Sequence, residues 1–297
     1  MLLVTLALAT QITYEQVACP VGTDDWARVY DKLAANQIGG WDSDLARYST
    51  EGQWREYAVA TCRDSLFSAY SSDMRMTLDA ETRATLEARL AEVTVGLEPE
   101  TIETWERYLI AAEMYRAMGR DSLFIAQLYL EASWTARDRA VGVYNGLEGP
   151  RQARDILDAG AVELKKDLDA RTRKIVLHNM IRVAHRGGFP DERDALLLDF
   201  EGVGDLDADE ARVLKEIRWI VHEVEPKLQD LALNELSLYL KTAPAGPERV
   251  RATYLMSDLL RRRGRLEDAK RGFKVVADNP DAQAEFQELA AWLVDNG

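Results

Sequence analysis

The chain has 297 residues and a formal net charge of −14, with 51 Asp and Glu against 37 Lys and Arg. Hydrophobic residues make up 47% and charged residues 30%, which is ordinary for a globular protein with a sizeable core. Binding to phosphate backbones requires clustered Lys and Arg, so this acidic balance argues against nucleic acid and anionic membranes as partners. No run of residues reaches the about 18 apolar residues of a membrane span.

The first ten residues predict an export signal. Residues 2–9 form an apolar run that ends in Ala7-Leu8-Ala9, the small-x-small pattern that a signal peptidase accepts. The run is short for such a signal and no Lys or Arg precedes it, so the alternative is a first strand or a buried helix. We expect an extracytoplasmic protein, periplasmic or secreted, with a cytoplasmic location as the alternative.

Residues 11–78 predict a small strand-containing cap. They hold both cysteines, and segments 12–18 and 56–61 are rich in β-formers, so two short strands are expected, each running into a cysteine. Between them, residues 39–45 read GGWDSDL, which is typical of a turn.

Several of these motifs resemble a known bacterial family. Cys19-Pro20-Val21-Gly22, the GGWDSDLARY segment at 39–48 and the strand before Cys62 are similar to the family called domain of unknown function 2225, and the resemblance covers residues 17–140. Members carry two Cys-x-x-Cys pairs that look like a zinc knuckle. Here Gly22 and Ser65 stand where each second cysteine would be, and two cysteines cannot supply the four ligands of tetrahedral zinc. The resemblance therefore implies a decayed zinc ribbon with no metal, no cofactor and no assigned activity.

The same resemblance implies a disulfide between Cys19 and Cys62. It places the two cysteines in opposite halves of the knuckle, where the sulfurs of an intact site lie within about 4 Å of one another. An oxidising compartment would favour the bond, and the N-terminal segment points to such a compartment. The alternative is a pair of buried free thiols.

From Asp79 to the C-terminus the sequence predicts helices. They are expected at residues 80–92, from Pro99 to about 118, at 122–139, 151–167, 170–186, 190–200, 208–223 and 227–242, as a pair within 247–280, and at 282–294. The Gly- and Pro-containing break at 142–150 marks a sub-boundary within this region.

The stretch 247–280 defines the predicted fold class. Ala269 is small, Phe273 follows four residues later, and Pro280 closes the unit, which resembles the second half of a tetratricopeptide repeat of about 34 residues. The chain is therefore expected to be mainly α: a tetratricopeptide-like array of antiparallel helix pairs over residues 79–297, with a small N-terminal α+β cap. Phe273 should be buried against Tyr254 or Leu255, and residues 99–295 should hold at least eight helices and no strand longer than three residues.

No catalytic motif accompanies this architecture. His178 and His185 lie two turns apart on one expected helix, which is too far for one metal ion, and His222-Glu223 has no second histidine four residues away. Neither cysteine has a histidine nearby to act as its base, and Gly-x-Ser-x-Gly and Gly-rich phosphate loops are absent. The sequence therefore predicts neither an enzyme nor a cofactor.

The expected function is a non-catalytic scaffold that binds a protein or peptide through the groove of its helical repeats. The candidate partner-binding residues are Trp105, Tyr108, Tyr115, Arg261, Arg262 and Arg265. Packing between helices is the alternative for the aromatic residues, and interaction with a helix dipole is the alternative for the arginines.

Two other functions stay open. One is an enzyme or a metal-ion-binding protein with its site around Asp42 and Asp44, where nearby Asp24 and Asp25 would add oxygen ligands for Ca²⁺. The other is a spacer within a larger envelope assembly. An enzyme should show carboxylates converging in a closed pocket, whereas a scaffold should show an open groove.

Overall fold

The structure is a computed structural model that describes residues 12–22, 24–33, 37–50, 52–204 and 206–297. The export signal predicted at residues 1–10 lies outside these. The chain is mainly helical with a few short strands, as predicted. It divides into two compact units: the first contains the described residues up to Gly39 and Arg47–Arg120, and the second contains Gly40–Ala46 and Asp121–Gly297. None of the described helices is long and apolar enough to cross a membrane.

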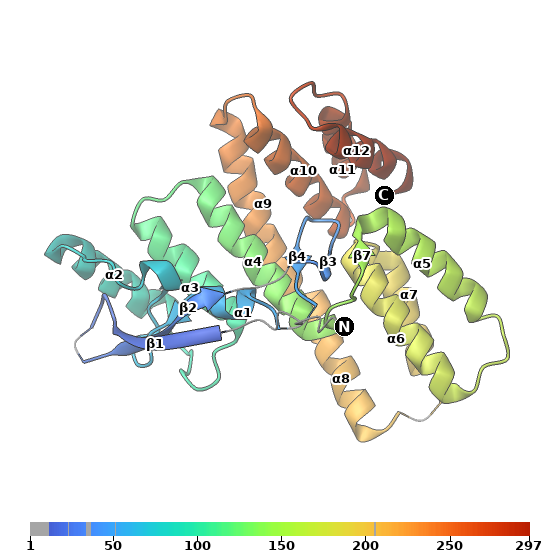
Figure 1. Ribbon diagram of the computed structural model, residues 1–297, viewed down its shortest axis with the longest axis horizontal. Helices are drawn as coiled ribbons and strands as arrows, with labels where there is room; N and C mark the ends of the chain where they lie inside the picture. The colour runs from blue at the N-terminus through green and yellow to red at the C-terminus, as the bar shows by residue number, and fades with distance from the viewer. Residues whose placement is uncertain (1–11, 23, 34–36, 51, 205) are drawn as a thin grey trace, which may run out of the picture. The chain divides into compact units, whose positions relative to one another are not determined.

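The strands of the first unit form two small antiparallel ladders (Figure 1). Strand β1 (Ile12–Ala18) has the predicted bounds and pairs with β2 (Trp26–Leu33), which the sequence analysis missed. Strand β5 (Val59–Thr61) pairs with β6 (Ser68–Tyr70), and the two-residue β4 is Arg47–Tyr48.

The strand predicted at residues 56–61 is wrong in its first half. Residues 55–58 form the single helical turn α1 (Arg55–Ala58). The buried Arg55 side chain donates to the carbonyl oxygen of Arg47, and its own carbonyl oxygen accepts a 2.8 Å hydrogen bond from the Tyr108 hydroxyl. These contacts, one of them from Tyr108, which is 53 residues away, override the local preference for a strand.

Helices α2 (Ala80–Val93) and α3 (Thr104–Ala117) complete the first unit, together with the 3₁₀ turn η1 (Ser71–Asp73). Asp79 caps α2 as predicted, because its side chain accepts a 2.7 Å hydrogen bond from the Thr82 amide. Helix α3 begins later than the expected Pro99, since Glu103 and Glu106 form a capping box at Thr104. Both helices belong to this compact unit, although the sequence assigned them to the array that was expected to begin at residue 79.

The second unit is helical apart from one short parallel ladder, β3 (Gly40–Trp41) with β7 (Leu147–Glu148). Its helices are α4 (Ser122–Val141), α5 (Gly149–Glu163), α6 (Ala170–Gly187), α7 (Pro190–Glu201), α8 (Ala208–Trp219), α9 (Glu225–Thr242), α10 (Pro247–Arg262), α11 (Leu266–Ala277) and α12 (Ala284–Asn296). In sequence order, α5 packs on α6, α6 on α7, α10 on α11 and α11 on α12. Helix α4 departs from the expected consecutive pairing, because it lies mainly along α9 (Figure 1).

A π-helical turn, η2 (Ile220–Val224), joins α8 to α9 where one helix was predicted to run to residue 223. Pro226 lies in the first turn of α9. Proline has no N–H and its ring crowds the preceding turn, so the wider π turn accommodates the change of register. This turn places Glu225 at the start of α9, where its carboxylate is buried.

The C-terminal helices pack around Phe273, as predicted. Its ring lies 5.5 Å from that of Tyr254, edge to face, and both side chains are buried with Ala269 and with Leu289 and Leu293 of α12. Within the described part of 99–295 there are more than eight helices, and the one strand there, β7, has two residues.

Candidate functional site

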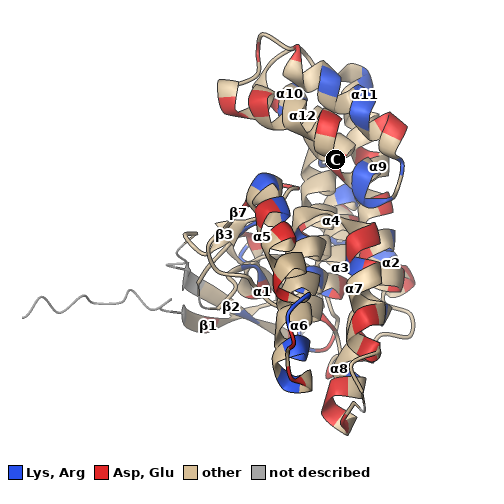
Figure 2. Ribbon diagram, turned by 90° about the vertical axis from the view of Figure 1, so that its right-hand side faces the viewer, with Lys and Arg blue, Asp and Glu red and all other residues tan. Residues whose placement is uncertain are grey.

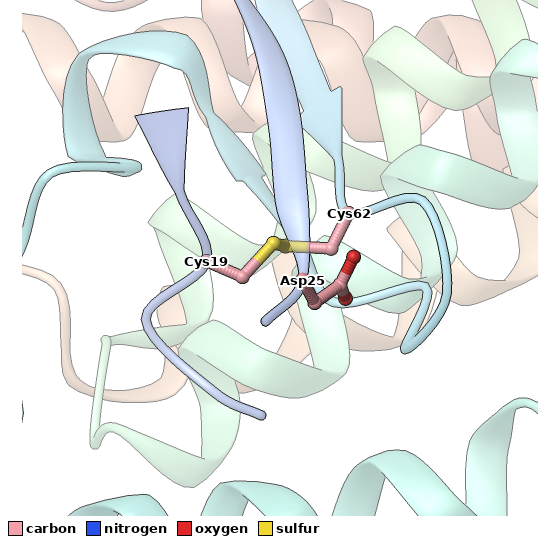
Figure 3. Close-up of side chains that lie close together, drawn as sticks. All are labelled: Cys19, Asp25 and Cys62. Carbon is pink, nitrogen blue, oxygen red and sulfur yellow. A yellow bond between two sulfur atoms is a disulfide. The ribbon is translucent and has the colours of Figure 1, made fainter. Parts of the chain in front are cut away.

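The cysteines of the first unit form the predicted disulfide, with Cα atoms 6.1 Å apart. Asp25 lies beside the bond (Figure 3), and these three side chains form the one group of potential metal ligands among the described residues. Burial opposes ionisation of Asp25, but hydrogen bonds from Ser65, Asp64 and Trp26 hold the pKa of its carboxyl below the ordinary value. Because the sulfurs are bonded to each other and the carboxylate accepts four hydrogen bonds, the group cross-links the cap.

In the second unit, the loop Gly40–Ala46 carries three fully buried polar residues, Asp42, Ser43 and Asp44. The Asp42 amide donates to the Ala46 carbonyl oxygen, and the Leu45 amide donates to the Asp42 carbonyl oxygen. Leu45 has a φ of 65°, a left-handed conformation that is strained for a leucine. Its side chain packs against the core formed by α10 to α12, which holds the turn in place.

Arg137 of α4 is the centre of the charges around this loop. Its guanidinium is fully buried and forms a bidentate pair with Asp44, with Nη1–Oδ1 and Nη2–Oδ2 distances of 2.9 and 2.7 Å. The same guanidinium donates to Asp42 Oδ2 at 2.8 Å and to Glu225 Oε1 at 2.7 Å. Arg186 of α6 donates to both oxygens of Asp42. The two arginines thereby join the loop to α4, α6 and α9.

A second set of ion pairs lies around Asp258 of α10, which contacts Ser43 of the loop. This carboxylate accepts hydrogen bonds from the Ser43 hydroxyl, Arg261 and Arg262. The two arginines also donate to the carbonyl oxygens of His185, Arg186, Gly187 and Gly188. The carbonyl groups at the end of α6 have no partners within the helix, so these contacts satisfy them.

His185 and Glu225 complete the cluster. His185 Nε2 lies 2.7 Å from Glu225 Oε2, and Arg193 Nη1 lies 3.3 Å from His185 Nδ1. Because a guanidinium can only donate, Nδ1 must accept and Nε2 must carry the proton. Burial is the main cause that lowers the pKa of His185 to about 4, so the ring is neutral at pH 7. Burial opposes ionisation of Glu225, but Arg137 and His185 hold the pKa of that carboxyl well below its usual range.

The arrangement disfavours the alternative site at Asp42 and Asp44. Burial raises the pKa of Asp42 against the attraction of Arg186 and Arg137, whereas the attraction of Arg137 and Arg262 overcomes burial and lowers the pKa of Asp44. Each of their four carboxylate oxygens accepts a hydrogen bond from an arginine. Oxygens in such contacts are poor ligands for a cation and poor general bases, so the cluster supports a structural role.

A small polar cavity of about 110 Å³ borders this cluster and is lined by His185, Arg193, Glu225 and Gln229, among others. Both nitrogens of His185 are hydrogen-bonded, and both oxygens of Glu225 accept hydrogen bonds. These hydrogen bonds hold the two groups within the buried cluster, Glu225 Oε1 with four donors and Oε2 with His185.

The predicted partner-binding residues lie mostly in the interior. Trp105, Tyr108 and Tyr115 are buried in the first unit, and Arg261 and Arg262 belong to the buried cluster of the second. Arg265 is exposed and pairs with Asp268. Burial favours the alternative of packing between helices for the three aromatic residues. Arg261 and Arg262 instead pair with Asp258 and donate to the carbonyl groups at the end of α6.

The surface of the second unit has an apolar groove of about 590 Å³ between α6 and α8. Its apolar lining consists of Ile175, Ile181, Phe200, Val213, Leu214 and Ile217. Ile175 is 55% exposed and Val213 is 38% exposed. Sequence reasoning missed this groove, although Ile175 gave a signal: it is a large apolar residue outside the buried stripe of Leu177, Ile181 and Ala184.

Comparison of the chain with protein-family models, with curated proteins and with solved structures found no match. The resemblance to domain of unknown function 2225 therefore stays a prediction.

Proposed function

We propose that the second unit is a non-catalytic protein-interaction module whose partner docks in the groove between α6 and α8. The observation that carries this proposal is the exposure of Ile175 and Val213 in a groove that is otherwise lined by apolar residues of α6, α7 and α8 and by charged residues at one end. Large side chains that line a concave apolar surface are typical of binding sites. The pairing of successive helices from α5 to α7 and from α10 to α12 supports a tetratricopeptide-like module.

The partner that we propose is a protein and not a nucleic acid. The net charge of −14 would repel a phosphate backbone, and the rim of the groove carries both signs of charge. We also propose an extracytoplasmic location, because the Cys19–Cys62 disulfide would persist in an oxidising compartment.

The proposal can be tested with immobilised protein as bait in an extract of the source cells. Ile175→Glu and Val213→Glu each place a charge in the groove at a side chain that is already partly exposed, so folding should be preserved. Val162→Glu is the matched control, because Val162 is 60% exposed on α5 and does not line the groove.

We expect a protein that is retained by the wild type and by Val162→Glu but lost from both groove variants. An identical set of proteins retained by all four baits would contradict the proposal.

A further inference from the structure

We infer that the groove takes one amphipathic α-helix of the partner, oriented antiparallel to α6 and α8, with an acidic side chain near its C-terminal end beside Arg171. This inference rests on the proposed function and adds the chemistry and direction of the occupant.

The dimensions of the groove suit a helix. Its lining extends from Arg171 to Ile181 on α6 and from Asp209 to Ile217 on α8. At 1.5 Å per residue these spans correspond to about 12 to 15 Å, or somewhat under three helical turns. A docked helix of this length presents apolar residues at i, i+3, i+4 and i+7, the spacing that helix-binding grooves recognise.

The two walls of the groove are themselves helices that run in the same direction (Figure 1). Lys174 and Glu210 join them near their N-terminal ends, with an Nζ–Oε2 distance of 2.6 Å. In the described part of the chain α6 and α8 make no extensive contact with each other, whereas α6 packs closely on both α5 and α7. A third helix between them would cover Ile175 and Val213, the two apolar side chains of the lining that are exposed.

The charges of the groove lie at one end. Arg171, Lys174, Asp209 and Glu210 all belong to the first turns of α6 and α8, while the opposite end is apolar, at Ile181 and Ile217. Figure 2 shows red and blue segments at the ends of these helices. Lys174 is paired with Glu210, and Asp209 lies 3.7 Å from Arg212.

Of the four charged residues at this end of the groove, Arg171 is the one whose side chain has no hydrogen-bond or ion-pair partner among the described residues. A carboxylate of the occupant can therefore pair with it. Helix N-termini carry partial positive charge and helix C-termini partial negative charge. A docked helix therefore gains most when its C-terminal end lies beside the N-termini of α6 and α8. Asp169 and Asp207 cap those two N-termini and reduce the dipole contribution, which leaves Arg171 as the main determinant of direction.

The test is a selection of helical peptides. A library displayed on a monomeric helical scaffold, randomised on one face and at both ends, is selected against the full chain. The enriched peptides are then measured against Ile175→Glu, Arg171→Glu and Val162→Glu.

We expect enriched peptides with apolar residues at helical spacing and Asp or Glu in the last turn. Their affinity should fall at least about tenfold for Ile175→Glu, because the new carboxylate would face their apolar row. It should stay unchanged for Val162→Glu. Selection against Arg171→Glu should replace the acidic residue with Lys or Arg.

Two results would overturn the inference. The first is a set of enriched peptides whose apolar residues do not follow helical spacing, and the second is a preference for Asp or Glu in the last turn that persists in selection against Arg171→Glu. If the bait assay still gives a groove-dependent partner, the proposed function stands in both cases. Binders insensitive to Ile175→Glu, with no groove-dependent partner, would overturn both. Native mass spectrometry that finds an apolar small molecule bound to the wild type and absent from Ile175→Glu would replace the helix with a different occupant.

Discussion

Arg137 and Asp44 are 93 residues apart in the sequence and form a bidentate ion pair in which neither side chain is exposed. The pair attaches the loop Gly40–Ala46 to α4, although residues on both sides of that loop belong to the other compact unit. Charges buried in this way are costly unless all of them are paired, so the cluster specifies one position for the loop.

Arg137→Met should therefore destabilise the protein strongly. The substitution removes one guanidinium and leaves the Asp42, Asp44 and Glu225 carboxylates without their shared partner. Breaking a buried pair in this way costs about 3–5 kcal/mol. Urea unfolding followed by circular dichroism measures the loss.

Arg139→Met is the matched control for that experiment. Arg139 lies two residues further along α4 and pairs with Glu216, but its side chain is 57% exposed. Exposed pairs contribute at most about 1 kcal/mol. Equal effects of the two substitutions would contradict the role assigned to the cluster.

The fragment Asp121–Gly297 should fold poorly without its loop. It contains Arg137, Arg186 and Arg262 but lacks the carboxylates of Asp42 and Asp44. We expect weak helical circular dichroism and no cooperative transition for the fragment alone, with recovery of both when a synthetic peptide of residues 37–50 is added. A peptide in which Asp42 and Asp44 are both changed to asparagine should restore less of the helical circular dichroism signal. A fragment that unfolds cooperatively, with the same midpoint whether or not the peptide is present, would be incompatible with this account.

Acid should destabilise the second unit through His185. Its pKa is about 4 in the folded chain and about 6.5 when unfolded, so the unfolded state binds the proton first as the pH falls. The contribution of His185 to the free energy of unfolding is therefore fully present above about pH 6.5. As the pH falls toward 4, the free energy of unfolding decreases by a total of about 3 kcal/mol through this residue.

The free energy of unfolding, measured by urea titration between pH 7 and pH 4.5, should decline less steeply for His185→Gln than for the wild type. His178→Gln should have a smaller effect on the slope, because burial also lowers the pKa of His178 but its side chain is less buried. A slope that His185→Gln leaves unchanged would show that this histidine does not govern the acid response.

The disulfide should be present in protein isolated from its native compartment. Alkylation under non-reducing conditions followed by mass spectrometry should detect no free thiol at Cys19 or Cys62. The bond closes a span of 43 residues, and in the chain-entropy model its removal by Cys62→Ser costs at most about 4 kcal/mol. Two alkylated cysteines would refute the assignment and remove the support for an oxidising location.

Local signals in the sequence were enough to predict most of the helices. Asp79 and the Asp121–Ser122 pair mark the starts of α2 and α4, and α7 begins at Pro190 as expected. The fold of residues 55–58 was not predictable in this way, because the turn depends on a hydrogen bond from Tyr108, 53 residues away, and on the carbonyl group of Arg47.

The buried cluster was equally inaccessible to sequence reasoning. Asp42 and Asp44 have the composition of an exposed turn, and Arg137 follows a stretch that reads as an ordinary amphipathic helix. Their burial depends on pairing across 93 to 95 residues, and neither periodicity nor composition contains that information. The disulfide was predicted because the family resemblance brought the two cysteines together.

The most direct test of the central claim is site-specific photocrosslinking in the source cells. A photoreactive amino acid at Val213 lies in the groove, and one at Val162 lies on an exposed part of α5 outside it. Irradiation should give a discrete protein adduct from position 213 that is absent from position 162 and disappears when Ile175→Glu is added. The same adduct from both positions, or none from position 213, would contradict the proposal that this groove is the binding site.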